Sequence, residues 1–266
     1  MRNFLASRIP VHCYVVIRFS VRFQDWTRRA YGQEDARSEW FAMRARLFRA
    51  SVVASLERQT VAPRRVFVLM DVDDVALWHQ HLDLPAPYVP VFVRAEDVDQ
   101  EISARLAADD TKNIVISRLD SDDAISRRYF EKITDTARNF WRLGITKAYM
   151  VAPNGHFTDL RRIQRVYFNC SPFISLYVHR YHGENIFDLE HLRILERHPV
   201  MVESVEWMQI IHGTNIGNRL YKKSRFEPDD ERKMELGDME EVGKGWPQGF
   251  PPGLAATAKS AVGSRG

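Results

Sequence analysis

The most constraining feature of this sequence is an apolar run that ends in a group of aspartates. Residues 114–119 read Ile-Val-Ile-Ser-Arg-Leu, and Asp120, Asp122 and Asp123 follow. A short run rich in β-branched residues is typical of a buried strand. The pattern after Ser126 predicts a helix with Ser126 as its N-cap. Ligands of open α/β folds bind at the carboxyl ends of the strands, so a site is expected at these aspartates. The apolar positions of the predicted helix are Tyr129, Phe130, Ile133, Ala137, Phe140 and Trp141.

Clustered carboxylates repel one another unless a cation lies between them. Oxygen ligands suit a hard divalent ion, and Mg²⁺ is usually held by one or two carboxylates together with substrate phosphates. The Asp-x-Asp at Asp120 and Asp122 therefore fits a clamp for a metal and a diphosphate. The alternative is that Asp122 and Asp123 only stabilise the N-terminus of the next helix, by about 0.3–1 kcal/mol each. A second Asp-x-Asp at Asp71 and Asp73 shows how often the bare pattern occurs.

Composition excludes several classes of protein. The 266 residues are 45% hydrophobic, which is enough for a substantial core. The net charge is +3, so no nucleic-acid partner is expected. Cys13 and Cys170 are the only cysteines and provide no disulfide framework. The sequence has no apolar run of transmembrane length, and we expect a cytoplasmic protein, compatible with a place at the surface of the inner membrane.

The first half of the chain alternates apolar runs with helical patterns. Such alternation predicts βα units and a mainly parallel sheet flanked by helices. It contains no dinucleotide fingerprint and no P-loop. Strands are expected at Val11–Ile17, which we place in the centre of the sheet, Val66–Met70, Val89–Val93 and from Ile114, and helices at Trp40–Arg58, Asp74–His81 and Asp97–Ala108. The helix at Trp40–Arg58 is expected to bury Phe41, Ala45, Phe48, Val52 and Leu56.

The pattern changes after Leu143. Short strands are expected at Ala148–Val151, His156–Thr158, Arg162–Phe168 and Phe173–Val178, separated by turns such as Asn154-Gly155. A short helix at Phe187–Leu195 and a strand at Val200–Val205 follow, and His212 is expected on a flexible turn. There it is either a ligand or a histidine of the surface or core. Residues 219–266 are charged and rich in Pro and Gly, which indicates a mobile tail outside the catalytic core.

Three segments together resemble the putative rhamnosyltransferase family of bacteria. The resemblance runs from about Val11 to Asn218, and its most specific part is the Trp-x-Gln-x-x-His-Gly-x-Asn pattern. The segments are residues 116–124 (ISRLDSDDA), 171–176 (SPFISL) and 207–218 (WMQIIHGTNIGN).

The resemblance implies a GT-A-like fold with one catalytic domain over residues 1–218. Its nucleotide-binding half would cover about 10–150 and its smaller mixed acceptor-side half about 151–218. It also implies a nucleotide-sugar donor, a divalent metal (Mn²⁺ or Mg²⁺) and an acceptor such as a glycan. The sugar could be rhamnose.

The resemblance also suggests roles for individual residues. Asp122 is the expected metal ligand, with Asp120 at the metal or the ribose, Asp123 supporting either, and His212 completing the site. Asp71 is placed to bind the base, or only to start the following helix. Arg18 and Arg118 would bind the diphosphate, since guanidinium groups match phosphate geometry, or form structural ion pairs.

An inverting transfer needs a group that takes the acceptor proton. No pattern ranks the candidates, and for each one taken alone plain surface charge is the better explanation. They are Glu184, Asp188, His191, Glu203 and Glu206.

Two other classes of function remain open at this point. The same clamp would serve a nucleotidyltransferase acting on a sugar phosphate, although the glycine-rich loop expected after Ile17 is missing. In a non-enzymatic alternative, the basic segment Arg22–Arg29 would bind an acidic partner, with steep salt dependence.

Overall fold

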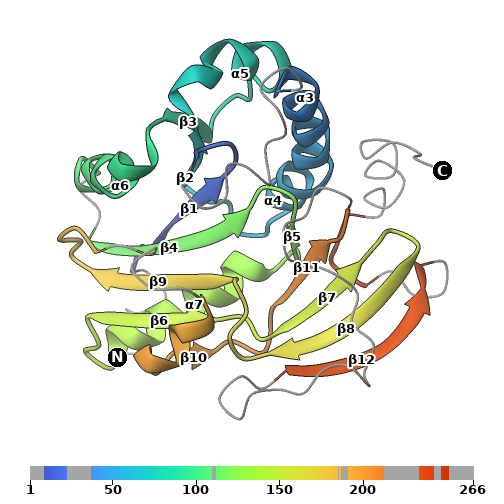
Figure 1. The fold of residues 1–266 in the computed structure, drawn as a ribbon. Helices are drawn as coiled ribbons and strands as arrows, with labels where there is room; N and C mark the ends of the chain where they lie inside the picture. Colours follow the sequence, from blue (N-terminus) through green and yellow to red (C-terminus); the bar gives the residue numbers. More distant parts are fainter. Residues whose placement is uncertain are drawn as a thin grey trace.

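Two β-sheets organise the protein, a seven-stranded central sheet and a five-stranded second sheet (Figure 1). The computed structural model describes residues 9–22, 37–109, 112–184, 186, 191–212, 234–242 and 247–251. The predicted α/β class, with a mainly parallel central sheet and a smaller mixed region, is confirmed.

The central sheet is parallel except at β9, which is antiparallel to both of its neighbours. β1 lies inside this sheet, between β4 and β2, as its almost unbroken apolar sequence predicts. The strands are, from edge to edge, β10 (Val200–Met201), β6 (Lys147–Val151), β9 (Ile174–His179), β4 (Asn113–Asp120), β1 (His12–Arg18), β2 (Arg65–Met70) and β3 (Tyr88–Phe92).

The strand order reverses at β1. The chain adds β2 and β3 on one side of β1 and then places β4 on the other side. The carboxyl ends of β1 and β4 therefore lie side by side, and Arg18 is opposite Asp120 in the register. Such a switch point is where open α/β sheets bind their ligands.

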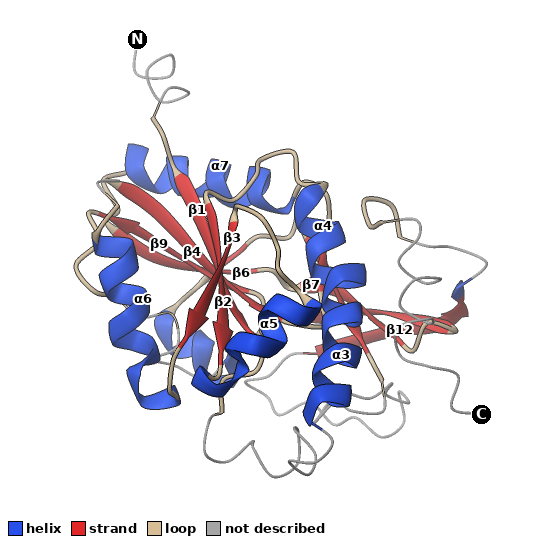
Figure 2. Ribbon diagram, turned by 90° about the horizontal axis from the view of Figure 1, so that it is seen from above, coloured by secondary structure: helices blue, strands red, loops and turns tan. Residues whose placement is uncertain are grey.

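Helices cover both faces of the central sheet (Figure 2). One face packs against α5 (Val75–His81), α7 (Tyr129–Arg142) and the helical segment that begins with α3 (Arg37–Phe48). The other face packs against α6 (Val98–Ala107). Short 3-10 turns precede α5 and α6 at Val72–Asp74 and Ala95–Asp97.

The helix predicted at Trp40–Arg58 is continuous, but it is not a single α-helix. α3 passes through a π-helical turn, Arg49–Val53, into α4 (Ala54–Glu57). The five apolar residues expected on its buried face all belong to the core of the central sheet. Leu47 and Ala50 pack in the opposite direction, against the second sheet. This segment therefore lies between the two sheets, as Figure 2 shows.

The second sheet is built from strands that are far apart in the sequence. Asn154-Gly155, predicted as a turn, begins one of its strands instead. Gly155 is required there because a Cβ atom at this position would lie 2.2 Å from the Trp207 ring, which crosses the strand. The strands are, in order, β12 (Met234–Glu241), β8 (Arg162–Phe168), β7 (Asn154–Thr158), β11 (Glu206–Ile210) and β5 (Ala124–Ile125).

The prediction that residues 219–266 form a mobile tail outside the core is wrong for part of this segment. β12 pairs with β8 and closes an edge that would otherwise expose unpaired backbone groups. Phe250 is buried with Leu47 and Met208, and the carbonyl of Gly249 accepts a hydrogen bond from the Arg127 backbone N–H.

The division into halves at residue 151 is not followed by the sheets. β9 and β10 lie in the central sheet although they come late in the chain, and β5 lies in the second sheet although it comes early. The strand predicted at Val200–Val205 is only β10, with β11 starting at Glu206.

Three local predictions also need correction. Ser126 does not cap α7, because its hydroxyl accepts the Glu206 backbone N–H and the helix begins at Tyr129. The Phe130 backbone N–H is bound by the Gln59 side chain instead. Trp141, expected on the buried face, is 39% exposed. The late helix is a 3-10 turn at His191–Arg197, and residues 187–190 of its predicted range lie outside the described residues.

Candidate active site at the carboxyl end of the central sheet

The switch point brings together charged groups from two neighbouring strands. Arg18 at the end of β1 donates a hydrogen bond to Asp120 at the end of β4, with 3.0 Å between Nη2 and Oδ1. Arg118 lies two residues earlier on β4 and is buried. Burial lowers the pKa of Arg118 to about 10, and the nearby Arg18 adds to this effect. Burial opposes ionisation of Asp120, but Arg18 and Arg118 outweigh it and hold the pKa of Asp120 below its usual value.

Asp122 meets two residues from distant parts of the chain. Its Oδ2 atom lies 2.9 Å from Nη1 of Arg44, on α3, and 2.9 Å from Nε2 of His212, just after β11. Burial opposes the negative charge of Asp122, but Arg44 and His212 more than compensate and strongly lower its pKa. Asp122 is therefore a carboxylate held ionised by its neighbours.

Asp123 has the opposite character. Its Oδ2 atom accepts a hydrogen bond of 3.3 Å from Gln209 on β11, while Oδ1 is buried without a hydrogen-bond partner. Burial, reinforced by the charges of Asp122 and Asp120, raises the pKa of Asp123 well above its usual value. Adjacent aspartates thus differ in which protonation state the fold favours.

Asp71 ends β2 and takes part in local contacts. Its carboxylate accepts a hydrogen bond of 3.0 Å from the Asp73 backbone N–H, and so caps the 3-10 turn that follows. It also lies 3.1 Å from Nε of Arg22. These contacts agree with the helix-starting role, while base binding stays a prediction. Most of the basic segment Arg22–Arg29 lies outside the described residues.

The four proton-acceptor candidates that the structure describes lie on segments other than the one that carries the aspartates. Glu184 accepts a hydrogen bond from the His182 backbone N–H, and Glu203 is exposed between β10 and β11. His191 opens the 3-10 turn that packs near β6 and β10. Asp188 lies outside the described residues. The identity of the proton acceptor stays a prediction.

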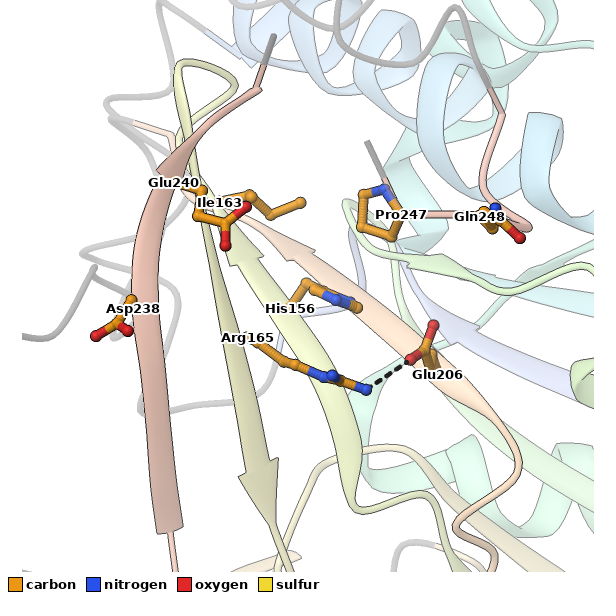
Figure 3. A pocket seen from close by; sticks show the side chains of 8 residues that line it. All are labelled: His156, Ile163, Arg165, Glu206, Asp238, Glu240, Pro247 and Gln248. Atoms are coloured by element: carbon orange, nitrogen blue, oxygen red, sulfur yellow. Dashed lines mark ion pairs between the residues drawn. The ribbon is translucent and has the colours of Figure 1, made fainter. Parts of the chain in front are cut away.

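Glu206 lies in a separate pocket of about 320 Å³ on the second sheet. It is 3.7 Å from Arg165, and Figure 3 shows this pair beside His156, with Asp238 on the other side of β12. His156 is buried, and its Nδ1 atom has no hydrogen-bond partner. Burial, aided by Arg165, lowers the pKa of His156 to about 4. β11 runs antiparallel to β5, and Trp207 is opposite Ile125, the last residue of β5. Glu206 comes just before Trp207, so it lies past the end of β5, on the side away from Asp122.

Arg44 and Gln209 are the contributors that sequence reasoning missed. The sequence spacing of Arg44 could have indicated its role. It lies three residues after Phe41 and three residues before Leu47, on the apolar face of the predicted helix. A charge on such a face needs a buried partner. Gln209 is a fixed position of the Trp-x-Gln-x-x-His-Gly-x-Asn pattern, but its partner could not be inferred, since only the pairing of β11 with β5 brings it to Asp123.

The side chains present fit a divalent cation at Asp122 and His212. Nε2 of His212 lies 2.9 Å from Oδ2 of Asp122 and 3.2 Å from Nη1 of Arg44. One nitrogen cannot donate a proton to Asp122 and accept one from Arg44 at the same time, whereas a cation would satisfy both the oxygen and the nitrogen lone pair.

The described residues contain no group of three or more His, Cys, Asp or Glu side chains arranged around a common point. Among the three predicted ligands, Asp122 and His212 meet directly, while Asp120 is bound to Arg18. One or two carboxylates completed by phosphate oxygens are the usual arrangement for Mg²⁺, and imidazole is a common ligand of transition metals.

Comparison with known proteins places the chain in a family. Residues 15–224 match the model of the family described as "Putative rhamnosyl transferase". The chain belongs to this family, which confirms the resemblance seen in its motifs. No curated protein sequence matches the chain.

The chain is similar to several solved structures at low sequence identity and low TM-score. A structure of Staphylococcus aureus TarS residues 1–349 in complex with UDP is 14% identical, with a TM-score of 0.28, over 54% of this chain and 36% of that one. Rv0371c from Mycobacterium tuberculosis, in complex with manganese, is 13% identical, with a TM-score of 0.32, over 74% of this chain and 87% of that one. The chain thus spans only about a third of the TarS structure.

No helix in the part of the chain that the structure describes is both long enough and apolar enough to cross a membrane.

Proposed function

We propose that this protein transfers a sugar from a nucleoside-diphosphate sugar to an acceptor, with a divalent cation bound by Asp122 and His212. The family assignment supports a glycosyltransferase. The observation that carries the proposal is the arrangement at the switch point, where Arg18 and Asp120 meet beside the pair of Asp122 and His212. We further propose that the donor carries rhamnose and that the acceptor is a glycan.

Each charged group has a distinct task in this proposal. Asp122 and His212 would hold the cation, which neutralises the charge that develops on the departing diphosphate. Arg18 and Arg118 present guanidinium groups at the same sheet edge and would orient the diphosphate, because their forked donors match phosphate oxygens. Asp120 holds Arg18 in place and would bind the ribose. Asp71, at the end of β2, would reach the base.

The test uses the full chain and a panel of nucleotides. Melting temperature is measured with nucleoside diphosphates, with and without Mn²⁺, and release of nucleoside diphosphate is then followed from sugar nucleotides that share one base and differ in the sugar. We expect stabilisation by nucleotide only when Mn²⁺ is present, and the fastest release from the rhamnose donor. Absence of any stabilisation would refute the proposal.

Product analysis separates the proposal from its alternatives. A nucleotidyltransferase would form pyrophosphate from a nucleoside triphosphate and a sugar phosphate instead of releasing a nucleoside diphosphate. A protein that only binds an acidic partner would show strong salt dependence and no response to Mn²⁺. A cytoplasmic location at the inner membrane surface is also part of the proposal, and cell fractionation tests it.

A further inference from the structure

Arg44 occupies the place where a cation held by Asp122 and His212 would lie. Its Nη1 atom is 2.9 Å from Oδ2 of Asp122 and 3.2 Å from Nε2 of His212. Its Nη2 atom donates a hydrogen bond to the Ser121 hydroxyl. The guanidinium group therefore touches both atoms that the proposed function assigns to the metal.

Arg44 reaches the aspartates from a helix that lies outside the central sheet. Arg44 lies on α3 between Phe41 and Leu47, on the segment that separates the two sheets. Its side chain is only 11% exposed, and its Cζ atom lies 6.0 Å from the centroid of the Trp40 ring. The position is thus built into the helix and is not the chance contact of a surface side chain.

The contacts of Arg44 are good but incomplete. Its Nε atom is buried without a hydrogen-bond partner, and an unsatisfied buried donor lowers the stability of this arrangement. Nη1 can only donate, so it competes with any cation for Oδ2 of Asp122. A guanidinium and a metal ion cannot both bind one oxygen and the adjacent imidazole nitrogen, since their like charges would repel at close range.

We propose that Arg44 is a displaceable counter-cation, which holds Asp122 and His212 when no donor is bound and moves to the diphosphate when the divalent cation enters. This inference rests on the proposed function. A released guanidinium next to a diphosphate has an obvious acceptor, because arginine binds phosphate oxygens through two parallel hydrogen bonds. The cation and the nucleotide would then bind cooperatively, since each makes the displacement of Arg44 more favourable for the other.

The test compares metal binding by the full-length protein and its Arg44→Met variant without nucleotide. Binding of Mn²⁺ is followed by calorimetry or by the electron paramagnetic resonance spectrum of free Mn²⁺. Methionine fills similar space without charge, so the variant is expected to bind Mn²⁺ at least about tenfold more tightly. With saturating Mn²⁺, its affinity for a nucleoside diphosphate is expected to fall by about tenfold. Arg46→Met is the matched control, because Arg46 is exposed on the same helix, and it should change neither value.

Several results would overturn the inference while leaving the proposed function intact. Equal or weaker Mn²⁺ binding by a folded Arg44→Met variant would show that the guanidinium does not compete with the metal. Binding of nucleoside diphosphate without Mn²⁺, lost in Arg44→Met, would make Arg44 a permanent cation of the site. Failure of both proteins to bind Mn²⁺ and nucleotide would overturn the inference together with the proposed function.

A second variant covers the case in which Arg44→Met does not fold. Ser121→Ala removes one hydrogen bond that holds Arg44 and keeps every charge. It should bind Mn²⁺ a few-fold more tightly, and unchanged affinity would count against the displacement.

Discussion

The two polar regions of this protein treat their charges in opposite ways. At the carboxyl end of the central sheet, Asp120 and Asp122 are each matched by an arginine, Arg18 and Arg44, and both carboxylates are held ionised. In the pocket of the second sheet, Arg165 reaches Glu206 only at 3.7 Å, and burial keeps His156 neutral at physiological pH.

This difference in charge pairing indicates which region has the side chains to bind a charged ligand. Ion pairs between buried groups carry a large desolvation cost, so a fold retains them where the charges have a use or strong partners. The first region offers guanidinium groups for a diphosphate and an oxygen and nitrogen pair for a cation. The second offers a neutral imidazole and an ion pair whose Arg165 side chain is 72% exposed, against 25% for Arg18 and 11% for Arg44.

Removal of the charge of Asp122 should have the largest effect. We expect Asp122→Asn to reduce sugar transfer by at least about 100-fold, since it removes a preorganised charge at the diphosphate site. The variant should remain folded by circular dichroism. Asp73→Asn is the matched control, because the Asp73 side chain is 73% exposed beside the same sheet edge. Transfer at the parent rate would show that Asp122 does not hold the cation.

The pocket of the second sheet should appear in the pH dependence of stability. The pKa of His156 is lowered to about 4 by burial, so the native state binds this proton more weakly than the unfolded chain does. The contribution of neutral His156 to the free energy of unfolding is complete above about pH 6.5 and is lost as the pH falls towards 4. We expect this loss to be about 3 kcal/mol. Denaturant unfolding of wild type and His156→Gln at several pH values measures it, and identical pH profiles would contradict it.

The charge of Asp123 should destabilise the native state, whereas the charge of its neighbour Asp122 stabilises it. The pKa of Asp123 is raised in the fold, so ionisation weakens the native state as the pH rises above the unfolded value of about 3.9. Asp123→Asn keeps the shape and removes the charge, and should make the protein more stable than the wild type at pH 8. Asp122→Asn should lower stability in the same assay. A destabilised Asp123→Asn variant would show that this aspartate is ionised.

The first region could be located from the sequence because its strands are local patterns. The runs ending at Arg18, Met70 and Asp120 are apolar and have the length of buried strands, and the edge at which they end follows from parallel pairing. His212, one partner of Asp122, was proposed from the sequence, but its arginine partner could not be found in this way. Arg44 reaches it only because α3 packs between two sheets, and the second of those sheets was not predicted as a sheet.

The second region was poorly predicted for a physical reason. β5 has two residues, and β12 is largely exposed and acidic, so neither shows the alternation that marks a strand. Both are defined by their partners: β11 pairs with β5, and β8 pairs with β12. Gly155 was taken for a turn residue because its close contact with Trp207 cannot be seen in the local sequence.

The smallest effect is expected for Glu206, the one candidate proton acceptor inside the pocket. Its carboxylate faces Arg165, and its backbone N–H is bound to Ser126, so the structure gives it a local role. We expect Glu206→Gln to change the rate of sugar transfer by no more than about twofold, the range of ordinary surface substitutions. Glu184→Gln, measured in parallel, provides the comparison outside the pocket. A large loss of rate for Glu206→Gln, with unchanged affinity for nucleotide and Mn²⁺, would join the two regions into one active site and reverse the contrast drawn between them.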